Sequence, residues 1–182
     1  MACHTLLYVQ KLLTKIILGS LTFGAVFGVT IFAGGTQVNA AESSSAKGRF
    51  GQTLTANIAN RTLPKDETTD VTVRGKGYNV KTGIYVTFCV VPPKGKKPEH
   101  CGSYNPTGIN TQAHWISSNP PFYAQILATK FGKGGTFKVT LPIGSTIGGY
   151  DCTQVQCGIL TRADHTNPDH RKADVIIPIT FK

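Results

Sequence analysis

The feature that most constrains this chain is a pair of cysteines, Cys152 and Cys157, placed five positions apart near its end. The second cysteine opens a run of alternating apolar residues over 157–162, and a second such run over 175–181 ends the chain. A polar loop lies between the two runs. Alternation over this length is typical of β-strands. The pattern therefore predicts a hairpin at the end of a β-sandwich, stapled by a short disulfide loop.

The first 40 residues have the layout of a secretory signal. Lys11 and Lys15 supply positive charge, and residues 16–35 are uncharged and rich in apolar residues and glycine. Small residues end this segment, so we expect cleavage after Ala40. The alternative is an uncleaved membrane anchor, because the apolar run approaches the about 18–20 residues that a span needs. The glycines and the small residues at the exit favour cleavage, which leaves no stable membrane span.

The part that follows cleavage suits a single domain. We expect a flexible serine-rich leader over 41–50 and a folded domain over 51–182. Only two of the 19 Lys and Arg residues precede Ala41, and all nine Asp and Glu residues follow it, so the remaining chain has a formal net charge of +8. We expect this form to be secreted, with at most loose association with the cell wall.

Four cysteines remain after cleavage, since Cys3 lies before the apolar run. An even count in a secreted chain predicts disulfides. Four cysteines allow three pairings, of which proximity in the sequence favours Cys89–Cys101 and Cys152–Cys157. A zinc site is the weaker alternative, because the spacings of 12 and 5 are not those of zinc ligands and secreted thiols are oxidised.

The rest of the folded part reads as short strands between turns, with no convincing helix and no internal repeat. The run Ile84–Val91 is apolar on both faces, which indicates a central strand, whereas Pro178 marks an edge or a bulge in the last strand. About seven strands with frequent turns predict an all-β fold, an immunoglobulin-like seven-stranded Greek-key β-sandwich. Further strands are expected within 51–59, 70–75 and 136–141.

A long segment without clear periodicity, 102–135, follows Cys101. Loops of this length are uncommon in small domains and are often functional. We expect this segment and the loop 94–100 to form a contact surface, because aromatic side chains often dominate interfaces. The alternative is that the aromatics only cover an open end of the core. The candidate contact residues are Tyr104, Trp115, Phe122 and Tyr123 in the segment and Lys94, Lys96 and Lys97 in the loop.

The excess of positive charge favours an anionic partner. Two lysine and arginine clusters, Arg74–Lys81 and Lys94–Lys97, lie in segments expected to neighbour each other, and we expect them to form one positive end. An anionic cell-envelope polymer or another surface protein fits this charge, and a simple solvated surface is the alternative. Nucleic acid is not expected, because the chain has no long basic run and no aromatic RNA-binding motif.

The residues offer little for catalysis. There is no Gly-x-Ser-x-Gly elbow, and we expect no enzyme activity and no cofactor. The densest group of ligand-type side chains is the segment 164–170, which holds two histidines and two aspartates. His165 and His170 are weak candidates for a metal site, because imidazole and carboxylate suit zinc or copper but the spacing matches no known zinc pattern.

Several of these motifs together resemble the neocarzinostatin family. They are Asp151-Cys152-Thr153 followed by Cys157-Gly158, the final Ile-Pro-Ile-Thr-Phe run, and the pair Cys89 and Cys101 just past a central strand. The family consists of secreted actinobacterial immunoglobulin-like domains with two short-range disulfides. The resemblance implies the same fold, the same cysteine pairing and a secreted location. Named members are apoproteins that hold an enediyne chromophore in a cleft.

The chain departs from the chromophore carriers around that cleft. An aromatic residue follows the first cysteine in the carriers, whereas Val90, Val91 and Pro92 follow Cys89 here. The ribbon before Cys152 is shorter, the segment after Cys101 is longer, and the domain is basic rather than acidic. We therefore expect a secreted, non-catalytic binding or cell-surface interaction module. The alternative is an apoprotein-like carrier of a small hydrophobic molecule, enediyne-type or similar, in a cleft beside the sandwich.

Overall fold

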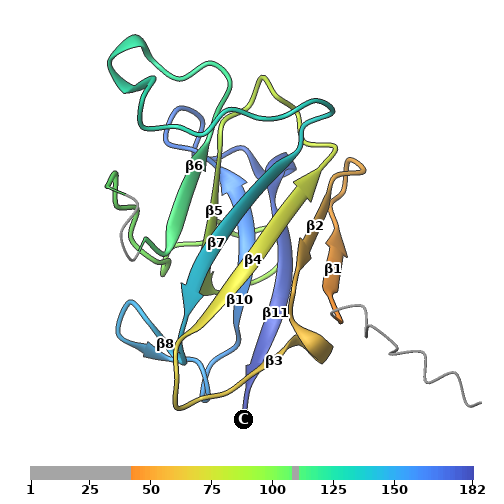
Figure 1. The fold of residues 1–182 in the computed structure, drawn as a ribbon, viewed down its shortest axis with the longest axis vertical. Helices are drawn as coiled ribbons and strands as arrows, with labels where there is room; N and C mark the ends of the chain where they lie inside the picture. The colour runs from red at the N-terminus through yellow and green to blue at the C-terminus, as the bar shows by residue number, and fades with distance from the viewer. Residues whose placement is uncertain (1–41, 108–110) are drawn as a thin grey trace, which may run out of the picture. The chain divides into compact units, whose positions relative to one another are not determined.

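The computed structural model describes residues 42–107 and 111–182. The expected signal segment, 1–40, lies outside the described residues. The described chain forms strands and three short 3-10 turns, η1 (Ala59–Arg61), η2 (Phe122–Ala124) and η3 (Arg171–Ala173). Two β-sheets pack face to face in this part of the chain (Figure 1). No helix in the described residues is long and apolar enough to cross a membrane.

The first sheet has four antiparallel strands in the order β1-β2-β4-β7. Its outer face is largely polar, because the outward-facing residues of β4 and β7, apart from Pro142, carry a charge or a hydroxyl, as in the cross-strand pair Arg74 and Lys138. The bounds are β1 Ser44–Lys47, β2 Thr53–Ala56, β4 Thr69–Lys76 and β7 Phe137–Ile143.

The second sheet has five strands in the order β3-β11-β10-β5-β6. β3 is short and runs parallel to the end of β11, and the other neighbours are antiparallel. A separate two-stranded ribbon, β8 with β9, precedes Cys152. The bounds are β3 Thr62–Leu63, β5 Ile84–Val90, β6 Ala113–Ile116, β8 Thr146–Ile147, β9 Tyr150–Asp151, β10 Cys157–Ala163 and β11 Val175–Phe181.

The core lies between the two sheets. Alternation with a period of two sends Leu54, Val73 and Leu141 inward from the first sheet, and Val86, Phe88 and Ile159 inward from the second. Phe88 also contacts the ring of Phe181 edge to face, with ring centroids 6.1 Å apart. These side chains are almost fully buried, so the alternation seen in the sequence is the pattern that closes the sandwich.

The fold class is confirmed as an immunoglobulin-like Greek-key sandwich. Seven principal strands divide into β2, β4 and β7 in one sheet and β5, β6, β10 and β11 in the other. The chain passes from one sheet to the other after β4, after β6 and after β7, which produces the Greek-key connection. Both disulfides, Cys89–Cys101 and Cys152–Cys157, are paired as proximity favoured.

Two expectations about single strands are also confirmed. β5 is central, since it pairs with β10 on one side and β6 on the other. Pro178 lies where β3 does not reach, because β3 pairs only with Thr180 and Phe181. The proline therefore removes no hydrogen bond from a ladder on the outer side of β11.

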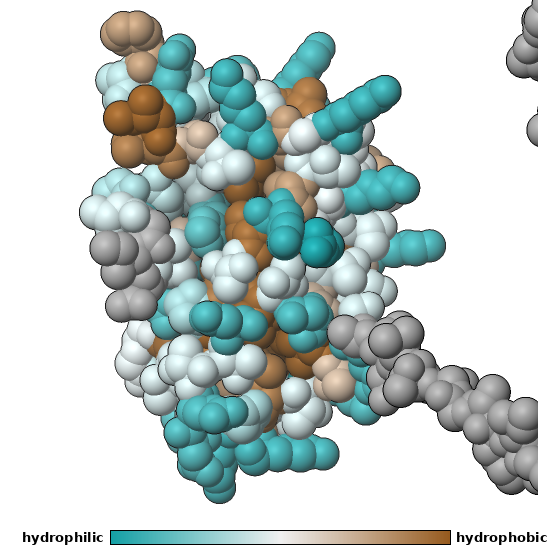
Figure 2. All heavy atoms as spheres, viewed as in Figure 1, coloured by the Kyte–Doolittle hydropathy of each residue, from teal (hydrophilic) through white to brown (hydrophobic). Residues whose placement is uncertain are grey.

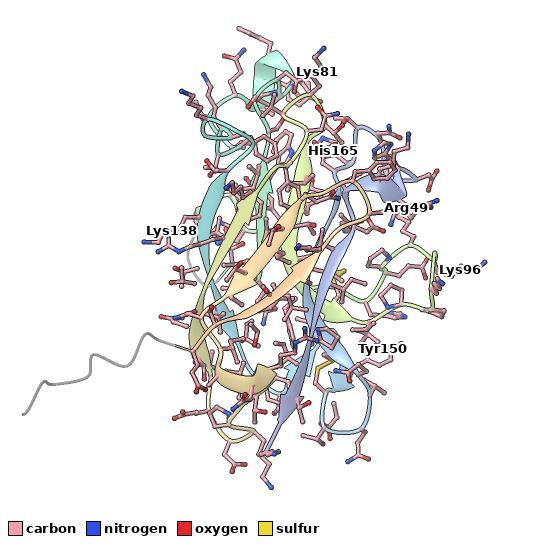
Figure 3. The ribbon with its side chains drawn as sticks, turned by 90° about the vertical axis from the view of Figure 1, so that its right-hand side faces the viewer. Arg49, Lys81, Lys96, Lys138, Tyr150 and His165 are labelled. Carbon is pink, nitrogen blue, oxygen red and sulfur yellow. A yellow bond between two sulfur atoms is a disulfide. The ribbon has the colours of Figure 1, made fainter. Side chains whose placement is uncertain are left out.

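Two expectations are wrong. The flexible leader over 41–50 contains β1, which pairs with β2 and is fixed where Ser44 Oγ donates a hydrogen bond to the carbonyl of Ile58 at 2.7 Å. The single positive end is also wrong, because Lys81 precedes β5 and Lys94 follows it. The two basic clusters therefore lie toward opposite ends of one strand, and Figure 3 shows Lys81 and Lys96 well separated.

Candidate functional site

The candidate site lies on the outer face of the five-stranded sheet. Alternation along β5 points Tyr85, Thr87 and Cys89 away from the core, and Arg162 of β10 lies opposite Tyr85. The start of the long segment folds back over this face, held by the Cys89–Cys101 disulfide and by Gly102, whose N–H donates to the carbonyl of Phe88 at 2.8 Å. A sheet face that is usually solvated is thereby partly covered.

Trp115 is buried within the covered face, beside Tyr85, and does not project toward solvent where a partner could bind it. It is only 4% exposed, and its indole N–H donates to Oδ2 of Asp164 at 2.8 Å. The expectation that Trp115 contacts a partner is therefore wrong. The alternative, that this aromatic side chain covers buried structure, is correct for Trp115. The strand β6, which carries Trp115, was not predicted from the sequence. Its four residues lie within an irregular segment, and their alternation is too short to recognise.

Asp164 is a buried carboxylate held entirely by neutral donors. Its Oδ1 accepts bonds from the N–H of Thr166 at 3.0 Å and from the Thr166 hydroxyl at 2.6 Å. Gly83 leaves the space for it, since a Cβ there would lie 1.9 Å from Oδ2. These donors replace the water that a buried carboxylate loses. Asp164 is thus a structural group that fixes the loop carrying His165.

A pocket of about 260 Å³ opens beside this anchor, between the sheet and the long segment. Tyr85 and Arg162 of the sheet, Tyr104 of the segment and His165 of the following loop all line it. Tyr85 Oη lies 2.7 Å from Nδ1 of His165, and the Tyr104 hydroxyl donates to the carbonyl of Leu127 at 2.7 Å. The rings of Tyr85 and Tyr104 lie 6.2 Å apart, so the pocket has aromatic walls.

Arg162 supplies the only formal positive charge among the residues that line this pocket. Its guanidinium carbon lies 5.3 Å from the centroid of the Tyr85 ring, a cation–π contact. Its Nε is buried and has no hydrogen-bond partner, and among the described residues no carboxylate lies within salt-bridge distance of it. Burial lowers the pKa of Arg162, yet a guanidinium stays charged at neutral pH.

The tyrosine hydroxyls stay protonated in this setting. Burial raises the pKa of Tyr85, with a further upward contribution from the negative charge of Asp164, and burial alone raises the pKa of Tyr104. Both phenols are therefore neutral at physiological pH, and each oxygen can still accept a hydrogen bond, although the Tyr104 hydroxyl already donates to the carbonyl of Leu127. The pocket presents one cation, two phenols and one imidazole.

A second ionic group lies behind Arg162. Arg171 Nη1 donates to Oδ2 of Asp174 at 3.0 Å, in a salt bridge between two side chains that are mostly buried. Burial raises the pKa of Asp174 to about 6, although the positive charges of Arg171 and Arg162 act in the opposite direction. Asp174 Oδ1 is buried without a partner. Asp174 thus interacts with the charge of Arg162 electrostatically, at a distance longer than a salt bridge.

The expected lysine contacts lie in a different place. Lys94, Lys96 and Lys97 are exposed on the loop after β5, and Lys96 and Lys97 line a separate hollow of about 630 Å³. Two carboxylates, Glu99 and Asp169, line the same hollow. It therefore carries less net positive charge than the run of lysines in the sequence indicates.

The two metal candidates are not brought together. His165 lines the pocket beside Tyr85, whereas His170 lines another hollow of about 380 Å³ together with Tyr78 and Lys172. Within the described residues no group of three His, Cys, Asp or Glu side chains is placed to hold a metal ion. His165 is a hydrogen-bond partner of Tyr85.

Three of the described histidines have hydrogen-bond partners that orient loops. His114 donates from Nε2 to the carbonyl of Thr140 at 2.8 Å, and His100 Nε2 lies 3.1 Å from the hydroxyl of Tyr150. With His165 bonded to Tyr85, each of these three rings contacts a phenol or a carbonyl.

The remaining two aromatic candidates are exposed. Phe122 and Tyr123 project from η2, outside the pocket, and the sequence did not single out their neighbours Ile126 and Leu127, which are exposed as well. Sequence reasoning also missed Tyr85 and Arg162. A signal for Arg162 was present, because it is a charged residue inside a strand whose other residues are apolar or small.

Comparisons with known proteins add a single structural likeness. No family model matches the chain, and no curated protein matches it. Among solved structures, macromomycin aligns with a TM-score of 0.44 and 16% sequence identity, over 71% of this chain and 99% of macromomycin. The immunoglobulin-like fold described above rests on the strand order and disulfides of this chain itself.

Proposed function

We propose that this chain is an extracellular, non-enzymatic binding protein, and that the pocket of Tyr85, Tyr104, Arg162 and His165 holds a small aromatic molecule with an acidic group. The single observation that carries the proposal is Arg162. A guanidinium half-buried against the ring of Tyr85, with no carboxylate of the described residues in contact, is costly unless an anion completes it. A carboxylate or similar acid would supply that anion, and a planar ring would pack against the open face or edge of the tyrosine rings.

The proposal develops the small-molecule alternative expected from the sequence. That alternative predicts a concave apolar pocket between the sandwich and the long segment. The pocket proposed as the ligand site lies between them and has aromatic walls, but it also contains Arg162 and His165. Its volume of about 260 Å³ is near the lower end of ligand pockets, which favours a ligand with one or two rings over a large chromophore. The two disulfides fit an oxidising environment outside the cell.

Binding of aromatic acids tests the proposal directly. Titration calorimetry with benzoate, 4-hydroxybenzoate and indole-3-acetate is expected to show saturable binding to at least one of these probes, and none to their uncharged amides. Arg162→Gln is expected to weaken binding at least tenfold, because a charge-assisted bond is lost. Arg74→Gln, which removes the same charge from the outer face of the other sheet, is expected to have no effect. Equal binding by both variants contradicts the proposal.

A further inference from the structure

The loop between β6 and β7 presents a cluster of apolar side chains to solvent. We call Phe122, Tyr123, Ile126 and Leu127 the apolar tip. Their exposed fractions are 89%, 79%, 94% and 39%. Figure 2 shows brown atoms gathered at the projecting loop that follows β6. An exposed apolar group of this kind on a small soluble domain marks an interaction site.

The tip is held in shape by the rest of the loop. The N–H of Ser117 donates to the carbonyl of Thr129 at 2.9 Å, and the N–H of Thr129 donates to the carbonyl of Trp115 at 2.9 Å, which closes the base. Tyr104 braces the far side through its bond to the carbonyl of Leu127. The apolar side chains are therefore carried by a loop whose shape is fixed by hydrogen bonds.

The backbone of the tip also suits transfer out of water. Pro120 and Pro121 have no N–H to desolvate, and the N–H groups of Ala124 and Leu127 already donate to carbonyls within the loop, at 2.9 and 3.0 Å. Unpaired backbone groups are the main obstacle to burying a loop in an apolar phase. The two prolines and these two hydrogen bonds reduce the number of unpaired backbone N–H groups that the tip would carry into an apolar phase.

Positive charge surrounds the tip. We call Lys81, Lys130 and Lys133 the basic flank. All three are exposed, and the loop of Lys81 is joined to the loop of Lys133 where Gly77 N–H donates to the carbonyl of Gly134 at 3.0 Å. Figure 3 shows Lys81 at the end of the sandwich opposite Tyr150. The tip therefore combines apolar insertion with charges placed for anionic headgroups.

We propose that the apolar tip inserts into the surface of an anionic lipid bilayer, with the basic flank against its headgroups. A projecting tip of aromatic and aliphatic side chains flanked by lysines fits the charged surface and apolar interior of an anionic bilayer, with the Tyr123 hydroxyl and the exposed Gln125 amide left at the level of the headgroups. The side chains are also those that favour the membrane interface, a tyrosine beside aliphatic residues and phenylalanine. The inference does not depend on ligand binding, since none of the four pocket residues is proposed to touch the bilayer, although Tyr104 joins the pocket to the tip through its bond to the carbonyl of Leu127.

The first experiment asks whether the tip enters the bilayer. It uses residues 41–182, which contain both sheets, both disulfides and the described core, and which omit the apolar segment 16–35 that would bind membranes by itself. One variant carries Phe122→Trp and a matched variant carries Tyr150→Trp at the opposite end. With phosphatidylglycerol vesicles that contain brominated acyl chains, we expect quenching and a blue shift for Phe122→Trp and neither for Tyr150→Trp.

The second experiment separates insertion from simple charge attraction by vesicle sedimentation. The double change Phe122→Ser and Ile126→Ser is expected to weaken binding to phosphatidylglycerol vesicles at least tenfold. Changing the basic flank to glutamine is expected to do the same, and to leave the weak binding to phosphatidylcholine unchanged. The control changes Lys65, Lys94 and Lys182, which lie away from the tip, to glutamine.

Three results would overturn the inference. One is the absence of quenching at Phe122→Trp, and a second is an equal loss of binding from the basic-flank variant and its control, which means general adsorption. The third is that the double serine variant leaves vesicle binding intact and instead dissociates a dimer in analytical ultracentrifugation, which makes a second copy of the chain the occupant. Circular dichroism melting of each variant checks that these exposed substitutions leave the fold intact.

Discussion

The indole N–H of Trp115 donates to the buried carboxylate of Asp164 across 2.8 Å, and this bond joins β6 to the loop that follows β10. The two residues are 49 positions apart in the sequence. Their contact positions His165, whose ring lies 4.9 Å from that of Trp115, at the edge of the pocket. Trp115, which we expected from the sequence to contact a partner, is thus a buried residue that holds the loop of His165 in place.

Removing the indole donor is expected to destabilise the fold. Trp115→Phe leaves Oδ2 of Asp164 buried without its donor, and we expect a loss of about 2 kcal/mol in the free energy of unfolding. Tyr104→Phe removes a bond that is open to solvent and is expected to cost less than about 1 kcal/mol. Urea denaturation measures both.

A double-mutant cycle with Asp164→Asn distinguishes the bond from the loss of ring volume. The two substitutions are expected to be coupled by about 1 kcal/mol or more, because they act on one hydrogen bond. Strictly additive losses would show that Trp115 stabilises the fold by packing alone.

Two adjacent glycines are expected to respond differently to alanine. Gly134 and Gly135 both have positive φ, of 72° and 65°. A Cβ at Gly134 meets nothing within 4 Å, so Gly134→Ala is expected to cost about 1 kcal/mol of backbone strain. A Cβ at Gly135 would lie 2.0 Å from the carbonyl oxygen of Tyr78, and we expect a loss of at least about 3 kcal/mol. Thermal melting gives the order, and equal losses would contradict it.

The raised pKa of Asp174 is expected to make stability depend on pH. In the folded protein this pKa is about 6, above the value of 3.8 for a free side chain, so between these pH values the folded state binds more protons than the unfolded state. Stability therefore decreases as the pH rises from about 4 to about 6 and is then constant. We expect the decrease from this group to be up to about 2 kcal/mol.

Asp174→Asn isolates this group from the other carboxylates. Subtracting the variant's unfolding free energies from those of the unchanged protein, across pH 3 to 8, is expected to recover the decrease between pH 4 and 6. A flat difference curve would mean that the Arg171 salt bridge compensates the burial of Asp174.

The expected signal cleavage stays a prediction that mass spectrometry of exported protein can test. We expect the chain to begin at Ala41 and to gain mass on reduction and alkylation at four cysteines, with none reacting before reduction. A chain that retains residues 1–40, or a free thiol in the native protein, would contradict the prediction.

Much of the scaffold was readable from local pattern. The strands β4, β5, β7, β10 and β11 follow alternating runs of six or more residues, and the turns between them contain glycine or proline. β1 and β6 were not predicted, because β1 lies in a serine-rich stretch and β6 in a long segment without clear periodicity, and neither four-residue strand continues into a longer alternating run as β2 does. Their strand state depends on pairing with β2 and β5, which are brought to them by the fold and not by their own composition.

The candidate site was far less readable, because it depends on distant residues meeting. Tyr85, Tyr104 and the neighbouring pair Arg162 and His165 come from three separate stretches of the chain. Nothing in their local sequence shows that they share a pocket. Conversely, the histidine and aspartate cluster at 164–170 is close in sequence and divided in space, since His165, Asp169 and His170 line three different hollows.

The sequence by itself determined the alternating strands and the favoured cysteine pairing, because both depend on residues near one another along the chain. The tertiary structure alone decided that Trp115 is buried, that Arg162 has no counter-ion in contact, and that the apolar tip is exposed. Burial and charge compensation depend on which side chains the two sheets and their loops bring together. That is a property of packing between segments, and no single segment encodes it.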